Sequence, residues 1–391
     1  MYKDVSSPGL QLSRAEPRSS ECPHASSARS GRVAAVSPAF TRFAAVGSFE
    51  EAPGAPWTPR FIDIPADRDD VVLERQGASG AVHEVWSRTG ARTSQPRLVA
   101  QGAHGSAYPD RYYFGGAAYS WNGAEAFLFG TNLNALGEQL ACGVARDGNL
   151  ETLIANSGAA RNRAPEEADY TQVARVSTAG SVVRGLWRIK LDEPGVGAID
   201  AAGQAVVVLP SGRFLVLLPE ADGKGNAVLA TDARADAGAT DASIVPPFAM
   251  LLYGGGAAGA LAARRSAGLS ASRLDAVRVD GTRAWTLTVP FLATQPPIDG
   301  NDVIYLVGGG LAAVGMDGHL LWSSLSSVPI RAQAFGDGSL AVVRGNELQI
   351  VAHDGAITRS FRAPDELTTY PAIASDGSVW VATEKALYVA R

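Results

Sequence analysis

The side chains best suited to hold a metal ion are the acidic residues of one segment. Asp232, Asp236 and Asp241 come shortly after Glu220 and Asp222. A calcium loop places oxygen ligands at alternate positions and has a fixed glycine at its sharp turn. These aspartates are four and five residues apart, so we expect a solvated loop rather than a calcium site.

Histidine and cysteine, the other common metal ligands, are few and scattered. The two cysteines, Cys22 and Cys142, cannot form a zinc ribbon or an iron–sulfur site, and we expect no disulfide between them. No two histidines have the spacing of a metal pair on one helix face or in a short loop. The five are His24, His83, His104, His319 and His353. We expect no metal site from them.

Two glycine runs, Gly254–Gly256 and Gly308–Gly310, are the segments that could cradle a phosphate. Such a cradle needs a strand, the loop and then a helix whose N-terminus faces the anion. Gly308–Gly310 lies between two apolar runs typical of strands, which predicts a hairpin turn instead. The chain also has no Gly-x-Ser-x-Gly nucleophile elbow. Linear motifs therefore give no positive evidence of catalysis.

The elements that would position any site repeat at a fixed period near the end of the chain. Two interleaved series of Asp-Gly pairs mark the repeat. The first series is Asp280-Gly281, Asp317-Gly318 and Asp354-Gly355, in steps of 37 residues, with Trp285 and Trp322 four residues after the first two glycines. The second is Asp299-Gly300, Asp337-Gly338 and Asp376-Gly377. Two hairpin turns in a period of this length indicate the four-stranded blade of a β-propeller.

The predicted fold is all-β: a single propeller of four-stranded antiparallel blades. Length predicts about seven blades, with six or eight as alternatives. We predict a disordered tail over residues 1–32 and the propeller over 33–391, with the clearest repeats over 240–391. The one stretch of helical composition, Ala257–Arg265, falls in what reads as a loop-like insertion.

The last repeat is incomplete, because the chain stops at Arg391 before an outer strand. An unfinished blade would leave an exposed sheet edge, which folded proteins avoid. We therefore predict that the missing strand comes from the N-terminal region, within 33–57. The two candidate segments are Val33–Val36 and Phe43–Val46.

Charge and hydropathy restrict the partners. A net charge of −5 argues against nucleic acid, which calls for a basic face. No run approaches the roughly 18 apolar residues of a membrane span, so we predict no membrane span. The first residues lack the basic start and apolar run of a signal peptide.

The Asp-Gly-x-x-x-Trp units at 280–285 and 317–322 resemble the PQQ-like repeat propellers, over residues 275–391 and faintly before 240. That superfamily includes quinoprotein alcohol dehydrogenases and a propeller scaffold lipoprotein of outer-membrane protein assembly. The resemblance implies that each tryptophan docks on the next blade. It also implies a periplasmic or surface location if a leader is missing from this sequence; without a leader, the expected location is cytoplasmic. Arg359 stands where the third tryptophan would be, with Phe361 nearby. No adjacent cysteine pair is present, so the cofactor, PQQ with its calcium, is not carried over.

Function is expected to reside in loops. A non-catalytic monomer that binds a protein or an extended polymer is the favoured hypothesis, with insertions around 155–168 and 219–243 on a rim. The alternative is a lactonase, lyase or quinone-dependent oxidoreductase with a site in the central channel. Loops that enter the innermost strands carry Gln295, Arg331 and Tyr370, which we predict to form a ligand or partner face. The structural blade residues are predicted to be Asp280, Gly281, Trp285, Asp317, Gly318, Trp322, Asp376 and Gly377.

Overall fold

Antiparallel strands are the regular secondary structure of the residues that the structure describes, and none of these residues lies in a helix. The computed structural model describes residues 33–49, 57–64, 70–77, 80–93 and 302–391, and between 94 and 301 it describes the strands given below with a few residues beside them. Within these residues the strands form eight sheets, seven of four strands and one of five. Residues 1–32, for which a disordered tail is predicted, lie outside the described part of the chain.

The first four sheets come in chain order. The first contains β2 (Thr58–Asp63), β3 (Asp70–Gly77), β4 (Gly80–Ser87) and β5 (Arg97–Val99). The second contains β6 (Ser106–Ala107), β7 (Arg111–Phe114), β8 (Ala117–Ser120) and β9 (Glu125–Leu128). The third contains β10 (Glu138–Gln139), β11 (Val144–Arg146), β12 (Asn149–Ser157), β13 (Thr171–Ala179) and β14 (Val182–Leu191). The fourth contains β15 (Val196–Ile199), β16 (Ala205–Val208), β17 (Arg213–Ala221) and β18 (Ala227–Arg234).

The other four sheets continue in order, and the last takes one strand from the opposite end of the chain. The fifth contains β19 (Ile244–Tyr253), β20 (Gly259–Ser266), β21 (Ser272–Arg278) and β22 (Arg283–Val289). The sixth contains β23 (Ile298–Asp299), β24 (Val303–Val307), β25 (Gly310–Gly315) and β26 (Leu320–Leu325). The seventh contains β27 (Ile330–Ala334), β28 (Leu340–Arg344), β29 (Glu347–Val351) and β30 (Ile357–Arg362). The eighth contains β31 (Ala372–Ile373), β32 (Val379–Ala382), β33 (Ala386–Ala390) and β1 (Phe43–Ser48).

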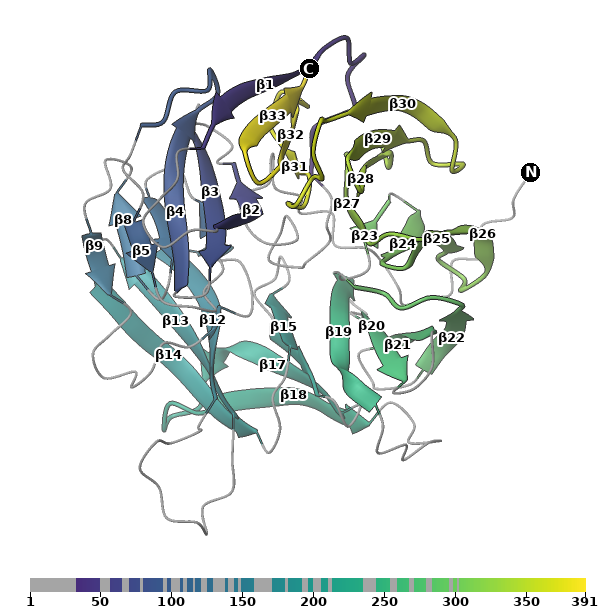
Figure 1. Ribbon diagram of the computed structural model, residues 1–391. Coiled ribbons are helices and arrows are strands. Elements are labelled where there is room, and N and C mark those ends of the chain that lie inside the picture. Colours follow the sequence, from purple (N-terminus) through teal and green to yellow (C-terminus); the bar gives the residue numbers. More distant parts are fainter. Residues whose placement is uncertain are drawn as a thin grey trace.

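The sheets follow one another around a ring, with β2, β15, β19, β27 and β31 nearest its centre (Figure 1). This is the arrangement of a β-propeller. The described strands form eight sheets, the upper value of the range that length predicted, rather than seven. The expectation that Ala257–Arg265 lies in a loop-like insertion is wrong. β20 covers most of this stretch and pairs with β19 and β21. Strand pairing on both sides outweighs the helix propensity of its alanines and arginines.

The Asp-Gly pairs form tight turns for a local reason. The glycines Gly318, Gly338, Gly355 and Gly377 all have φ between 81° and 88°, a region that L side chains disfavour. The aspartate carboxylate before each glycine accepts the backbone N–H two residues on, as in His319 N to Asp317 Oδ1 at 3.1 Å and Ser378 N to Asp376 Oδ1 at 2.9 Å. This side-chain bond mimics a backbone turn, which explains why aspartate precedes glycine.

Each of the two repeat tryptophans docks on the Asp-Gly turn of the following sheet. Trp285 Nε1 donates to the Met316 carbonyl at 2.9 Å, and Trp322 Nε1 donates to the His353 carbonyl at 3.1 Å. A Cβ placed on Gly318 would lie 2.7 Å from the Trp285 ring. The tryptophan therefore needs a glycine beneath it. Asp280 and Gly281, the first pair of the series, lie outside the described residues.

The contact between tryptophan and glycine gives a stability prediction. Gly318→Ala is expected to lower the free energy of unfolding by roughly 2 kcal/mol, because it adds backbone strain and a clash with Trp285. Gly345→Ala is the matched control, since Gly345 also has a positive φ, 59°, but has no heavy atom within 4 Å of the added Cβ. Its expected cost is about 1 kcal/mol, from strain alone. Chemical denaturation of both variants measures the difference, and equal losses would contradict the docking role.

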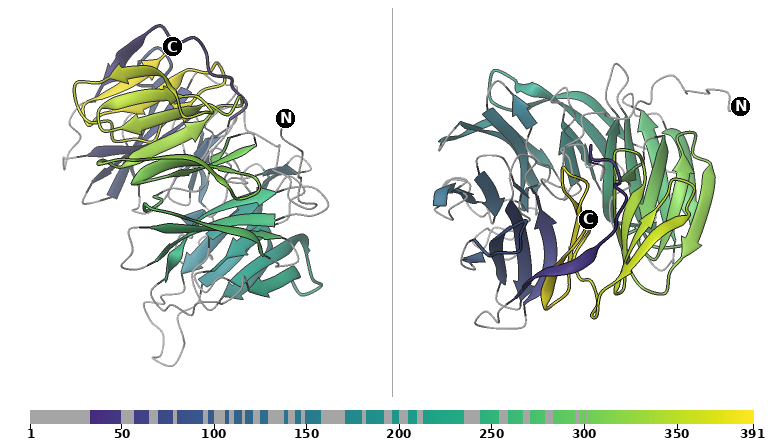
Figure 2. Two further views of the ribbon diagram at one scale, coloured as in Figure 1. Left: turned by 90° about the vertical axis from the view of Figure 1, so that its right-hand side faces the viewer. Right: turned by 90° about the horizontal axis from the view of Figure 1, so that it is seen from above.

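The last sheet is completed by the N-terminal segment, as its incomplete repeat led us to expect. β1 pairs antiparallel with β33, from Phe43 opposite Ala390 to Ser48 opposite Ala386. In Figure 2 (right) this purple strand lies alongside the yellow C-terminal strands. Of the two candidate segments, Phe43–Val46 is therefore the paired strand.

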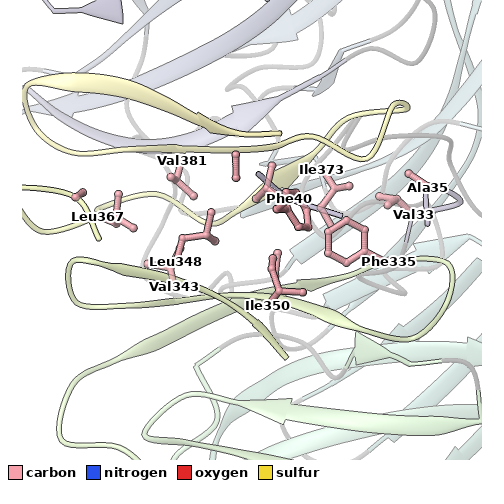
Figure 3. Packing of buried hydrophobic residues seen from close by; sticks show 14 residues of the cluster. Val33, Ala35, Phe40, Phe335, Val343, Leu348, Ile350, Leu367, Ile373 and Val381 are labelled. Atoms are coloured by element: carbon pink, nitrogen blue, oxygen red, sulfur yellow. The ribbon is translucent and has the colours of Figure 1, made fainter. Parts of the chain in front are cut away.

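The other candidate, Val33–Val36, contributes buried side chains and hydrogen bonds instead. Val33 N donates to the Ala334 carbonyl at 3.0 Å, and Gly336 N donates to the Ala35 carbonyl at 2.8 Å. Val33, Ala35 and Phe40 are buried between the seventh and eighth sheets, where the Phe40 ring lies 6.1 Å from that of Phe335 (Figure 3). Phe361 replaces the absent third tryptophan in part: its ring stacks on Phe43 at 5.5 Å. The N-terminal segment thus fills the seam between the seventh and eighth sheets.

Candidate functional site

A cavity of about 360 Å³ opens where several inner strands begin. β2, β3 and β27 contribute side chains directly, and the segments leading into β23, β27 and β31 supply the rest. The lining includes Arg60, Phe61, Gln76, Thr294, Arg331, Thr368 and Tyr370. Thr58 of β2 lies opposite Gln76 of β3 in the sheet register, so β3 brings Gln76 to the same end.

Two arginines share this cavity. Arg331, the second residue of β27, is half-buried, and its Nη1 donates to the Leu367 carbonyl at 3.2 Å. Burial lowers the pKa of Arg331; the nearby Tyr370 and Glu366 raise it, and the positive charge of Arg60 lowers it. The lowering by Arg60 is the signature of like-charge repulsion. The Arg331 guanidinium remains charged at neutral pH because the ordinary pKa of arginine is far higher.

An aromatic pair forms one wall of the cavity. The Phe61 and Tyr370 rings stack with centroids 5.7 Å apart and an interplanar angle of 6°. Burial raises the pKa of the Tyr370 hydroxyl, although Arg331 and Arg60 oppose the shift. Tyr370 is therefore protonated at neutral pH and can donate a hydrogen bond. Its position is fixed by neighbours: Thr368 N donates to the Ala382 carbonyl at 2.8 Å, and Ala382 N donates to Thr369 Oγ1 at 2.9 Å.

Buried acids lie behind the Gln76 side of the cavity. Gln76 Nε2 donates to Glu74 Oε1 at 2.8 Å. Burial raises the pKa of Glu74 to about 7, and the hydrogen bond from Gln76 opposes the rise. Burial also raises the pKa of Asp63, and the charge of Glu74 adds to that effect. Both acids therefore favour the neutral form inside the protein.

The neighbouring residue in β3 carries a buried ion pair. Strand alternation directs Arg75 to the opposite face from Glu74. Arg75 pairs with Glu84, and Glu84 Oε2 also accepts a hydrogen bond from Trp86 Nε1 at 3.0 Å. The Arg75 guanidinium also lies over the Phe49 ring, 5.3 Å from its centroid. This pair fixes β3 and β4 against the segment after β1, and so supports the wall that carries Gln76.

The structure brings together two of the three residues predicted for a ligand face. Arg331 and Tyr370 both line the cavity, whereas Gln295 lies outside the described residues. Arg60 and Phe61 also line the cavity and were not predicted from the sequence. The rule used for Arg331, a side chain near the start of an innermost strand, would have found them if it had been applied to Phe61–Ile64. The assignment of a ligand face stays a prediction.

The acidic segment considered for calcium is engaged in local contacts. Asp232 accepts two hydrogen bonds from Arg213, at 2.8 and 2.7 Å, which lower the pKa of its carboxyl group. Asp222 caps its own turn by accepting the backbone N–H groups of Lys224 and Asn226, each at 2.8 Å. Asp236 and Asp241 lie outside the described residues. Over the part of the chain that is described, no three His, Cys, Asp or Glu side chains gather as a metal would require.

The remaining expectations concern histidine, glycine and membrane spans. His319 and His353 are exposed, and His319 Nδ1 lies 3.1 Å from Asp317 Oδ2. Gly308–Gly310 connects β24 to β25 without an intervening helix. Among the described residues there is no helix long and apolar enough to cross a membrane.

Comparison with known proteins finds similarity in structure alone. No family model and no curated protein matches the sequence. The propeller of Dos1 matches over 89% of this chain and 95% of its own, with a TM-score of 0.56 and 10% identity. BamB from Moraxella catarrhalis matches over 89% of this chain and 99% of its own, with a TM-score of 0.50 and 13% identity. The likeness to these two structures shows the fold, and it confirms that the chain is a β-propeller.

Proposed function

We propose that the protein is a non-catalytic, eight-bladed propeller that binds a protein partner through the face around the Arg60–Arg331–Tyr370 cavity. The chemistry of the cavity lining carries this proposal. Guanidinium groups do not exchange protons at neutral pH, and the raised pKa of Tyr370 keeps its hydroxyl protonated. These groups can donate hydrogen bonds and attract negative charge, which suits recognition rather than acid–base catalysis.

The composition of this face also supports binding. Arginine and tyrosine are enriched among the residues that dominate the energy of protein interfaces. Here Arg60 and Arg331 stand on inner strands, and Tyr370 lies in the segment leading into β31 and stacks on Phe61. Strand pairing and packing hold their backbone in place, so less conformational freedom is lost on binding. The connecting segments at the same face can vary without disturbing the sheets, which is how propellers acquire different partners.

Co-purification of the full chain from its native cells tests this function. We expect Arg331→Gln to reduce recovery of specific partners at least about tenfold, as for a binding hot spot. Arg359→Gln is the matched control. Arg359 belongs to the outermost strand β30, so this substitution removes the same charge away from the cavity. Equal recovery of every protein by wild type and both variants would contradict the proposal.

The enzymatic alternative has its own direct measurement. The absorption spectrum and the metal content of the protein purified from native cells report a bound quinone or a stoichiometric metal ion. The proposal predicts neither. A quinone spectrum or one equivalent of calcium that disappears with Arg331→Gln would assign the cavity to a cofactor and overturn the binding function.

A further inference from the structure

Among the described residues that line the cavity, two carry a positive charge, Arg60 and Arg331, and none carries a negative charge. Within the described part of the chain, neither Arg60 nor Arg331 takes part in a salt bridge. The hydrogen bond that Arg331 makes is to a neutral carbonyl, that of Leu367. Glu366 affects Arg331 through its charge but is exposed. Two like charges are thus held in one half-buried space.

Donor groups remain available for a bound anion. A guanidinium has five N–H donors arranged to match the two oxygens of a carboxylate. Nη1 of Arg331 donates to the Leu367 carbonyl, and the described residues accept no other hydrogen bond from this guanidinium. Arg60 is exposed at the cavity. An anion between the two would replace mutual repulsion by two attractive contacts.

The size and walls of the cavity limit what the anion can be attached to. A volume of about 360 Å³ is near the lower end of ligand sites, which span roughly 300–1,000 Å³. The stacked Phe61 and Tyr370 rings offer an apolar surface on which side-chain methylene groups can pack. The described lining has two basic side chains, Arg60 and Arg331, which are too few for a polymer of phosphates, whose binding depends on many basic contacts. One or two carboxylate side chains of an extended segment fit these limits.

We propose that the cavity formed by Arg60, Arg331, Phe61 and Tyr370 binds the carboxylate side chains of an acidic, extended segment of the partner protein. This inference rests on the proposed binding function and names the chemistry of its ligand. The arginines hold the carboxylate oxygens, the aromatic pair contacts the methylene groups, and Thr368 and Gln76 supply polar contacts at the edge.

Calorimetric titration with a capped hexaglutamate peptide tests the inference on the full chain. We expect binding at low salt that weakens as salt is raised, and no binding of capped hexaglutamine. Arg60→Gln and Arg331→Gln should each weaken hexaglutamate binding at least tenfold, and Arg359→Gln should leave it unchanged. Binding that is equal in all variants, or absent in the wild type, would overturn the inference.

A thermal-shift series separates the peptide from a free anion. Hexaglutamate should raise the melting temperature of the wild type more than inorganic phosphate at equal ionic strength. Arg60→Gln should abolish this rise and, without ligand, melt no lower than the wild type because it removes the repulsion with Arg331. An equal or larger rise with phosphate would identify a site for free anions and overturn the inference.

The two proposals fail in distinguishable ways. If hexaglutamate binds in an arginine-dependent manner but no cellular partner depends on Arg331, the partner function fails and the carboxylate site stands. If a partner depends on Arg331 but hexaglutamate does not bind, the partner function stands and the carboxylate inference fails.

Discussion

Removal of residues 1–48 is expected to lower the free energy of unfolding by 5 kcal/mol or more, on the order of what the buried Val33 and Phe40 side chains contribute together with strand pairing. The truncation removes β1 and so exposes the edge of β33. It also opens the seam between the seventh and eighth sheets that Phe40 fills. Thermal and chemical unfolding, followed by circular dichroism, measure the loss.

Removal of residues 1–32 alone is the matched control. The contacts described above begin at Val33, so this shorter truncation should change the unfolding free energy by less than about 0.5 kcal/mol. If the longer truncation does not yield folded protein, two point variants replace it. Phe40→Ala should cost about 3 kcal/mol and Val36→Ala, whose side chain is 63% exposed, almost nothing. If the chain without residues 1–48 had the same free energy of unfolding as the full-length chain, ring closure by β1 would be contradicted.

The second large effect depends on pH and concerns Glu74. Its pKa is about 7 in the folded protein against 4.5 for the free group, chiefly because the carboxyl group is buried. The folded state therefore binds a proton that the unfolded chain releases above pH 4.5. The stability that Glu74 contributes is complete below pH 4.5 and is lost as pH rises to about 7, by a total of about 3 kcal/mol.

Glu74→Gln isolates this effect because glutamine resembles the neutral acid. The variant should match the wild type near pH 4.5 and be more stable by about 3 kcal/mol at pH 8. Glu347→Gln serves as a control of opposite sign. Hydrogen bonds from Arg362 and Gln349 lower the pKa of Glu347, so its replacement should cost stability at pH 8 and not raise it. Urea unfolding at several pH values gives both differences, and a Glu74 difference that is independent of pH would contradict the assignment.

The second half of the fold could be predicted well from the sequence because its turns are chemically explicit. A tight turn with positive φ requires glycine, and an aspartate before it supplies the side-chain hydrogen bond. Gly318, Gly338, Gly355 and Gly377 therefore mark their hairpins directly. The incomplete last repeat indicated an N-terminal strand for a different reason, because sheet edges must be paired or covered.

Other parts were hidden because tertiary contacts decide them. Trp187 docks like the repeat tryptophans, with Nε1 donating to the Pro219 carbonyl at 3.1 Å, but no Asp-Gly spacing announces it. Ala257–Arg265 has the composition of a helix, and the pairing of β20 with two neighbours makes it a strand. The choice between Val33–Val36 and Phe43–Val46 depended on register with β33, which the two short apolar runs do not encode.

The candidate site was predictable in position and only partly in membership. Arg331 and Tyr370 follow from the rule that loops entering inner strands form the functional face of a propeller. Arg60 and Phe61 belong to β2, at least 270 residues earlier in the chain. Only closure of the ring stacks Phe61 on Tyr370 and places Arg60 in the same cavity as Arg331. The charge repulsion between Arg60 and Arg331 is thus a property of the folded ring and has no local signal in the sequence.

The central claim is that a partner contacts the face around Arg60, Arg331 and Tyr370. Photo-crosslinking in native cells tests it most directly, with benzoylphenylalanine in place of Thr368, which lines the cavity, or of Ile357 on the outer strand β30. We predict a discrete adduct from position 368 that disappears when Arg331→Gln is added, and none from position 357. No adduct at position 368, the same adduct from both positions, or an adduct that persists with Arg331→Gln, would contradict the account.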